Sequence, residues 1–315
     1  MKTLARLATA SVVLTYLHLV FGGVVRITGS GMGCGDHWPK CLGSWIPPFD
    51  HPTVMIEWTH RLLALLVVVS IAGLAFAARQ RRAEAGVGGP GGVARPAVAA
   101  LVLVLAVALL GMVTVKLGNS AVPTVAHWTL ALALLAVLLV TAVRAGALGG
   151  AAARLETGTG RAVRSLGAGA ALAFVTVVLG GVVAKYPGGA VACPSFPLCG
   201  ATPAGVAPAA SHLQLTHRMF AYLLFFHVIA VTAAISRRQG ESRVAGRAAK
   251  VAAGLVLLQL GVGAAMVMSM LPPALRSIHQ ATGIAVWLAM FLAACLARTS
   301  DIGHRTSDMG SNGHV

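Results

Sequence analysis

Acidic residues are scarce in this sequence. Only 8 of its 315 residues are Asp or Glu, and charged residues of both signs together make up 10% of the chain. Soluble domains carry about a quarter charged residues, so this composition excludes an ordinary soluble enzyme. With 57% hydrophobic residues and a mean hydropathy of +0.83, the chain is predicted to be an integral membrane protein.

Apolar segments long enough to cross a bilayer recur along the chain. A membrane-spanning helix needs about twenty mostly apolar residues. The sequence predicts eight such spans, near 3–25, 58–78, 97–115, 124–144, 163–184, 212–235, 248–270 and 277–298. The expected fold class is therefore an all-α integral membrane protein with eight transmembrane helices.

The net charge of +16 does not indicate nucleic-acid binding. If the N-terminus is cytoplasmic, most of the 24 basic residues fall in segments on the same side of the membrane. This asymmetry is the positive-inside pattern of membrane proteins. It predicts a multi-pass plasma-membrane protein with both termini in the cytoplasm.

The chain is a tandem repeat. The sequence Gly-Gly-Val-Val at 22–25 returns at 180–183, which is 158 residues later (180 − 22). The sequence Thr-His-Arg at 59–61 returns at 216–218, which is 157 residues later (217 − 60). An offset this constant indicates a duplication.

The repeat predicts two halves, 1–150 and 151–298, followed by a disordered cytoplasmic tail over 299–315. Each half would hold four helices, so both halves would enter the membrane in the same direction. We therefore expect two tandem four-helix bundles related by a pseudo-twofold axis along the membrane normal.

Four histidines occupy repeated positions near the outer ends of even-numbered spans: His60, His127, His217 and His279. A polar imidazole inside a span is costly and suggests a function. Two imidazoles from facing helices are suitable axial ligands for a haem iron in a bundle core. We expect His60 to pair with His127 and His217 with His279, each pair about one turn inside the bundle.

A carboxylate distinguishes the two halves. Glu57 is three residues before His60, so both fall on one helix face, whereas the matched position before His217 is Gln214. A carboxylate can move protons or stabilise developing positive charge. The first half is therefore expected to carry out chemistry and the second to hold a permanent cofactor, although an acid at a helix start also favours the helix dipole.

Four of the five cysteines form two close pairs in the outer loops, Cys34 with Cys41 and Cys193 with Cys199. Each pair could form a disulfide that stiffens its loop. For the first pair, a dithiol that passes electrons out of the site is an equal alternative. For the second pair, a structural disulfide is favoured.

Two further kinds of polar residue lie near these sites. Arg61 and Arg218 could pair with the carboxylate tails of a porphyrin, although such residues also serve as snorkelling anchors. His18 in the first span has no matched histidine, and we expect it to be a hydrogen-bonded packing residue rather than a ligand.

The motifs together resemble the haem A synthases of bacteria. The first loop carries GGVVRITGSGM at 22–32, then Cys34, Asp-His-Trp-Pro at 36–39 and Cys41. The remaining matches are Glu-Trp-Thr-His-Arg at 57–61, His-Trp at 127–128, Thr-His-Arg at 216–218 and Ile-His-Gln at 278–280. The resemblance extends to about residue 298.

This resemblance implies an enzyme of the bacterial plasma membrane that converts haem O to haem A for haem–copper oxidases. A ring methyl would be oxidised to a formyl group by successive hydroxylations. The resemblance assigns a haem b cofactor to His217 and His279 and the substrate haem to His60 and His127, with Glu57 and the Cys34–Cys41 pair needed for activity. It implies haem O synthase and oxidase assembly factors as partners, besides membrane lipid.

Two other functions fit some of the same residues. A two-haem membrane cytochrome exchanging electrons with quinone would hold permanent haems at both sites, and would favour different depths for them. A haem carrier would need polar residues inside the spans to mark an entry route. The difference between Glu57 and Gln214 favours the enzyme.

Overall fold

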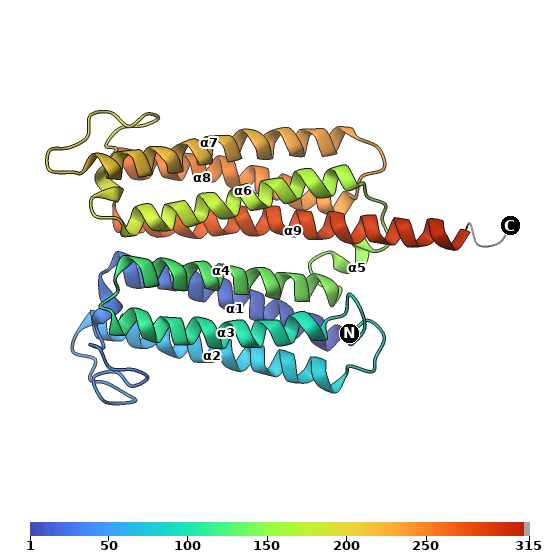
Figure 1. Ribbon diagram of the computed structural model, residues 1–315, viewed down its shortest axis with the longest axis horizontal. Coiled ribbons are helices and arrows are strands. Elements are labelled where there is room, and N and C mark those ends of the chain that lie inside the picture. The colour runs from blue at the N-terminus through green and yellow to red at the C-terminus, as the bar shows by residue number, and fades with distance from the viewer. Residues whose placement is uncertain (312–315) are drawn as a thin grey trace. The chain divides into compact units, whose positions relative to one another are not determined.

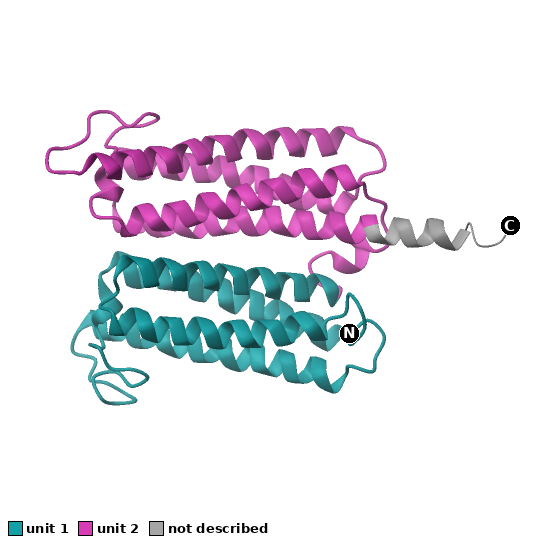
Figure 2. Cartoon of the chain, in the orientation of Figure 1, with its two compact units in different colours: residues 1–145 teal, residues 146–315 magenta. Residues whose placement is uncertain are grey.

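The computed structural model describes residues 1–311, with side chains described as far as Asp301. The predicted tail, 299–315, lies mostly outside the residues whose side chains are described. The chain divides into two compact units, unit 1 over residues 1–145 and unit 2 over residues 146–315 (Figure 2).

Unit 1 is a bundle of four long helices (Figure 1). They are α1 (Lys2–Ile27), α2 (Pro52–Gln80), α3 (Ala94–Lys116) and α4 (Ala121–Arg144). Each helix contacts the next one along the chain, and α1 contacts α4, which closes the bundle. A 3-10 turn, η1 (Ser30–Met32), begins the long loop between α1 and α2 and packs against both helices.

Unit 2 repeats this order of elements. Its long helices are α6 (Gly160–Lys185), α7 (Pro208–Arg237), α8 (Arg243–Met268) and α9 (Pro273–Ser311). Sequential helices are again in contact, and α6 contacts α9. The long loop before α7 carries η2 (Gly189–Val191), and the short helix α5 (Gly150–Ala153) packs on α8 and α9.

Within the described residues, eight helices are long and apolar enough to cross a membrane, which confirms the eight predicted spans. Two differences bear on the site: α2 and α7 begin at Pro52 and Pro208 rather than near 58 and 212. Proline suits a first helical turn because its fixed φ matches the helix and its missing N–H has no intrahelical partner there. Glu57 and His60 consequently lie inside one continuous helix.

Serine and threonine side chains cap two helices of unit 2 at the end away from its long loop. The hydroxyl of Thr159 accepts the N–H of Ala162 at 3.2 Å at the start of α6. The hydroxyl of Ser242 accepts the N–H of Ala245 at 3.3 Å at the start of α8. Each bond satisfies a backbone donor that the helix itself leaves unpaired.

The buried core lies mainly in the half of each bundle away from the long loop. In α4 the buried residues all fall between Ala131 and Val143, and in α9 the described buried residues begin at Ile284. The predicted ligands His127 and His279 precede these segments. Dense packing therefore holds each bundle together at one end, and the histidines lie in the other half.

The contact between η1 and α2 gives a prediction about stability. A Cβ built on Gly33 would lie 2.3 Å from the carbonyl oxygen of Thr53 and 2.9 Å from the N of Val54. Both contacts are with backbone, so Gly33→Ala must displace the loop, and we expect it to destabilise the protein by about 1–3 kcal/mol. Thermal unfolding in detergent measures the loss. Gly73→Ala is the control because no atom lies within 4 Å of its added Cβ; equal unfolding temperatures for the two variants would contradict this packing.

Candidate functional site

Each of the four predicted histidines packs its ring against a glycine of the neighbouring helix. The pairs are His60 with Gly22, His127 with Gly111, His217 with Gly180 and His279 with Gly263. A Cβ on the glycine would lie 3.3, 3.0, 3.0 and 3.2 Å, respectively, from Cε1 of the ring. The glycines therefore provide the space in which each imidazole lies against a helix backbone.

The structure brings together the histidines that the sequence predicts as pairs. His60 and His127 lie close enough in unit 1 to interact electrostatically, and so do His217 and His279 in unit 2. The early starts of α2 and α7 place His60 and His217 about two helical turns inside their helices rather than the expected one.

Backbone carbonyls fix the ring nitrogens of two of the histidines. Nδ1 of His127 lies 3.0 Å from the carbonyl oxygen of Val107, and Nδ1 of His217 lies 3.1 Å from that of Thr176. Because a carbonyl can only accept a hydrogen bond, Nδ1 must carry the proton, and Nε2 keeps its lone pair. Metal-ligating histidines are usually held in this way.

The other two histidines have different neighbours. The ring of His60 stacks on His18, with centroids 4.3 Å apart and planes 13° apart, and its buried Nδ1 has no hydrogen-bond partner among the described residues. The ring nitrogens of His279 lie 3.1 and 3.3 Å from the side-chain nitrogen of Gln259. Gln259 also bonds to the carbonyl of His279 and to the hydroxyl of Thr282.

Next to the histidine pair of unit 1, a buried carboxylate connects α2 to the long loop. Glu57 is 3% exposed; its Oε2 accepts the N–H of Cys34 at 2.8 Å and its Oε1 accepts from Arg61 at 2.6 Å. The same guanidinium donates to the carbonyls of His37 and Lys40, both at 2.8 Å. Arg61 therefore ties the loop to the helix that carries His60.

Unit 2 contains the same connection without the carboxylate. The side-chain oxygen of Gln214 accepts the N–H of Cys193 at 3.0 Å. Arg218 donates to the carbonyls of Cys193 at 2.8 Å, Ser195 at 2.6 Å and Leu198 at 2.8 Å. Glu57 and Gln214 thus perform the same loop-holding role, and the difference between them is a buried negative charge in unit 1.

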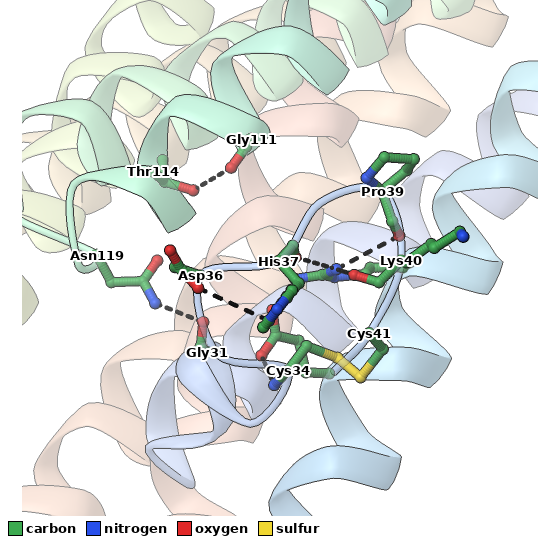
Figure 3. Close-up of polar contacts among 12 residues, drawn as sticks. Gly31, Cys34, Asp36, His37, Pro39, Lys40, Cys41, Gly111, Thr114 and Asn119 are labelled. Atoms are coloured by element: carbon green, nitrogen blue, oxygen red, sulfur yellow. Dashed lines mark hydrogen bonds and ion pairs between the residues drawn. A yellow bond between two sulfur atoms is a disulfide. The ribbon is translucent and has the colours of Figure 1, made fainter. Parts of the chain in front are cut away.

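Both long loops are closed by disulfides. Cys34 bonds to Cys41 and Cys193 to Cys199, as predicted. Figure 3 shows the first disulfide beside a second attachment of this loop, in which Asn119 donates to the carbonyl of Gly31 at 2.6 Å. Asn119 lies in the turn between α3 and α4, so this bond ties the helix pair carrying His127 to the same loop.

Several of these residues were not predicted from sequence. The roles of Gly111 and Gly263, of Gln259 and of Asn119 depend on which helices are neighbours. The guanidinium groups of Arg61 and Arg218 bond to loop carbonyls, and their contact with a porphyrin stays a prediction. The sequence does contain a signal for both arginines, because each directly follows a repeated histidine, His60 or His217.

The histidine pairs favour a metal-containing group that already supplies most of the ligands of its metal. Within the described residues, no group of three or more His, Cys, Asp or Glu side chains is placed to hold a metal ion. A porphyrin supplies four nitrogen ligands to its iron and leaves two axial positions. One imidazole of each pair, His127 in unit 1 and His217 in unit 2, keeps Nε2 available for such an iron, so the pairs fit a haem better than a bare metal ion.

The fold and the site define a multi-pass helical membrane protein with a histidine pair in each of two matched bundles. A comparison with family models identifies the family. The chain belongs to the COX15-CtaA family, described as cytochrome oxidase assembly protein, whose model matches residues 5–291.

Several bacterial proteins named "Heme A synthase" resemble the chain over most of their length. The protein of Geobacillus kaustophilus is 27% identical over 272 residues, covering 86% of this chain and 84% of the relative. That of Bacillus licheniformis is 28% identical, covering 86% and 88%, and that of Geobacillus thermodenitrificans is 28% identical, covering 84% and 82%. A 55-residue segment, 18% of this chain, is 47% identical to 9% of the protohaem IX farnesyltransferase of Thermus thermophilus.

The connection made by Arg218 predicts a measurable effect on the second loop. Arg218→Gln removes charged hydrogen bonds to the loop carbonyls of Cys193, Ser195 and Leu198 and a longer one to that of Pro197. A buried hydrogen bond to a charged group contributes roughly 1.5–3 kcal/mol. We expect faster hydrogen–deuterium exchange over residues 193–200 and a lower unfolding temperature. Tyr222→Phe is the matched control because it removes one neutral bond, to the carbonyl of Pro197. Equal exchange in the two variants would contradict the role given to Arg218.

Proposed function

We propose that this protein is a haem A synthase, an oxidoreductase that converts haem O to haem A. In this reaction a ring methyl becomes a formyl group through successive hydroxylations. The observation that carries the proposal is the similarity to relatives of that name over more than four fifths of both chains. The family match and the two histidine pairs support it.

We assign His217 and His279 to a resident haem b and His60 and His127 to the substrate haem O. The hydrogen bonds from Nδ1 of His127 and His217 to backbone carbonyls support Nε2 of each ring as the atom that would hold a haem iron. At His279, the amide of Gln259 must move aside from Nε2 to admit an iron. Haem b, when bound, supplies a one-electron redox centre.

Glu57 supplies the chemical difference between the two units in this proposal. Its carboxylate is buried, is paired with Arg61 and lies on the same face of α2 as His60. A fixed negative charge there can accept a proton or stabilise positive charge developing on the substrate. Gln214 accepts the corresponding N–H of Cys193 and offers no such charge.

The remaining parts of the proposal concern partners and membrane topology. Haem O carries a farnesyl group, so a haem O synthase supplies the substrate. Haem A would pass to haem–copper oxidases with the help of assembly factors. The charge distribution supports a bacterial plasma membrane with both termini cytoplasmic, and the repeat supports a pseudo-twofold axis along the membrane normal.

Glu57→Gln separates the charge of this residue from its role in holding the loop. Glutamine is the residue that unit 2 uses at the matched position, so the bond to the N–H of Cys34 can be kept. We expect haem A yield to fall about 100-fold or more, because general acid–base catalysis usually contributes at least that factor to a rate. The content of resident haem b should stay at the wild-type level. Haem extraction and chromatography measure both. Normal haem A production by Glu57→Gln would exclude chemistry by this carboxylate.

The close contact between His217 and Gly180 predicts that binding of the resident haem depends on the packing of this ring. A Cβ on Gly180 would lie 3.0 Å from Cε1 of His217, so Gly180→Ala must displace the ring. We expect a lower haem b content and an altered low-spin spectrum. Gly167→Ala on the same helix is the control, because no atom lies within 4 Å of its added Cβ. An unchanged haem spectrum in Gly180→Ala would refute the assignment of His217.

A further inference from the structure

His60 is held differently from its counterpart in unit 2. His217 donates through Nδ1 to the carbonyl of Thr176 at 3.1 Å. The corresponding Nδ1 of His60 is buried and has no hydrogen-bond partner within the described chain. Of the two matched histidines that follow the long loops, only the one in unit 2 is therefore fixed by a backbone hydrogen bond.

A third histidine occupies the position that corresponds to Thr176. The Gly-Gly-Val-Val repeat aligns α1 with α6 at an offset of 158, so Thr176 corresponds to His18 (176 − 158). The ring of His18 stacks nearly parallel on that of His60, with 4.3 Å between centroids. Nδ1 of His18 is also buried without a hydrogen-bond partner in the described residues. His18 packs against a neighbouring helix, as predicted. The predicted hydrogen bond of its side chain is not found at Nδ1.

The two ways of holding a histidine have different consequences for a bound iron. A hydrogen bond from Nδ1–H to a carbonyl fixes the tautomer and the ring orientation and makes Nε2 a stronger ligand. Stacking fixes the plane of the ring, but it fixes neither the tautomer nor the rotation within that plane. A ligand held only by stacking binds iron less firmly.

We propose that His18 is a positioning residue that weakens the hold of His60 on a haem in unit 1, so that this haem can exchange. It holds the ring of His60 by stacking in place of the backbone hydrogen bond that fixes His217. The inference rests on the proposed function, in which unit 1 must admit haem O and release haem A at every turnover. The site of unit 2 has no such requirement, and a threonine stands at the matched position.

Reciprocal substitutions test this proposal. His18→Thr removes the stacking ring and leaves the carbonyl of residue 18 as an acceptor for His60, as Thr176 is for His217. Thr176→His introduces the unit 1 residue into unit 2. His18→Phe is the matched control because it keeps a stacking ring without ring nitrogens.

The full-length proteins are purified with their resident haem, loaded with haem O and mixed with excess apomyoglobin. Haem O and haem b remaining on the protein are separated by chromatography at successive times. We expect His18→Thr to release haem O about 10–100-fold more slowly than wild type, which is the usual effect of such a hydrogen bond. His18→Phe should release it at nearly the wild-type rate, and Thr176→His should release haem b faster.

Electron paramagnetic resonance gives a second readout that a simple packing role would not change. The low-spin signal of haem O in His18→Thr should shift toward that of the resident haem. Release of haem O from His18→Thr within twofold of wild type, with an unshifted signal, would overturn the proposal. If His18→Thr does not fold, unchanged release of haem b from Thr176→His would overturn it. Failure of the wild-type protein to take up haem O would instead overturn the proposed function.

Discussion

The close approach of an imidazole ring to a glycine of the next helix is the constraint on which the sites depend. It recurs at His60, His127, His217 and His279, and in each case a Cβ on the glycine would crowd the ring. A side chain this polar has few favourable positions inside an apolar bundle. The glycines provide such a position beside the backbone, where two of the rings also donate to a carbonyl.

The long loops are attached to the same helices that carry the ligands. An arginine next to the histidine bonds to loop carbonyls in each unit, and a residue one turn earlier accepts the N–H of a disulfide-bonded cysteine. The two units share this framework and differ at single positions within it. In the proposed function, a charge at Glu57 instead of Gln214 and a ring at His18 instead of Thr176 give two similar bundles different properties.

The sequence was sufficient for features that depend on composition or on repetition. Eight spans, four repeated histidines and two cysteine pairs are visible because hydropathy and a constant offset reveal them. The starts of α2 and α7 were placed too late because polar residues after Pro52 and Pro208 lower the local hydropathy although the helix has begun. The contacts of Gln259 and Asn119 depend on the packing of neighbouring helices and loops, which no single-segment pattern encodes.

The most direct test of the account is to identify the haems made when this protein is expressed in a host that produces haem O but no haem A. The purified protein and the membranes are extracted, and their haems are separated by chromatography. The account predicts haem A beside haem b, with no haem A in the host lacking this chain. Two equivalents of haem b and no haem A, with haem O present in the membranes, would contradict it and identify an electron-transfer cytochrome.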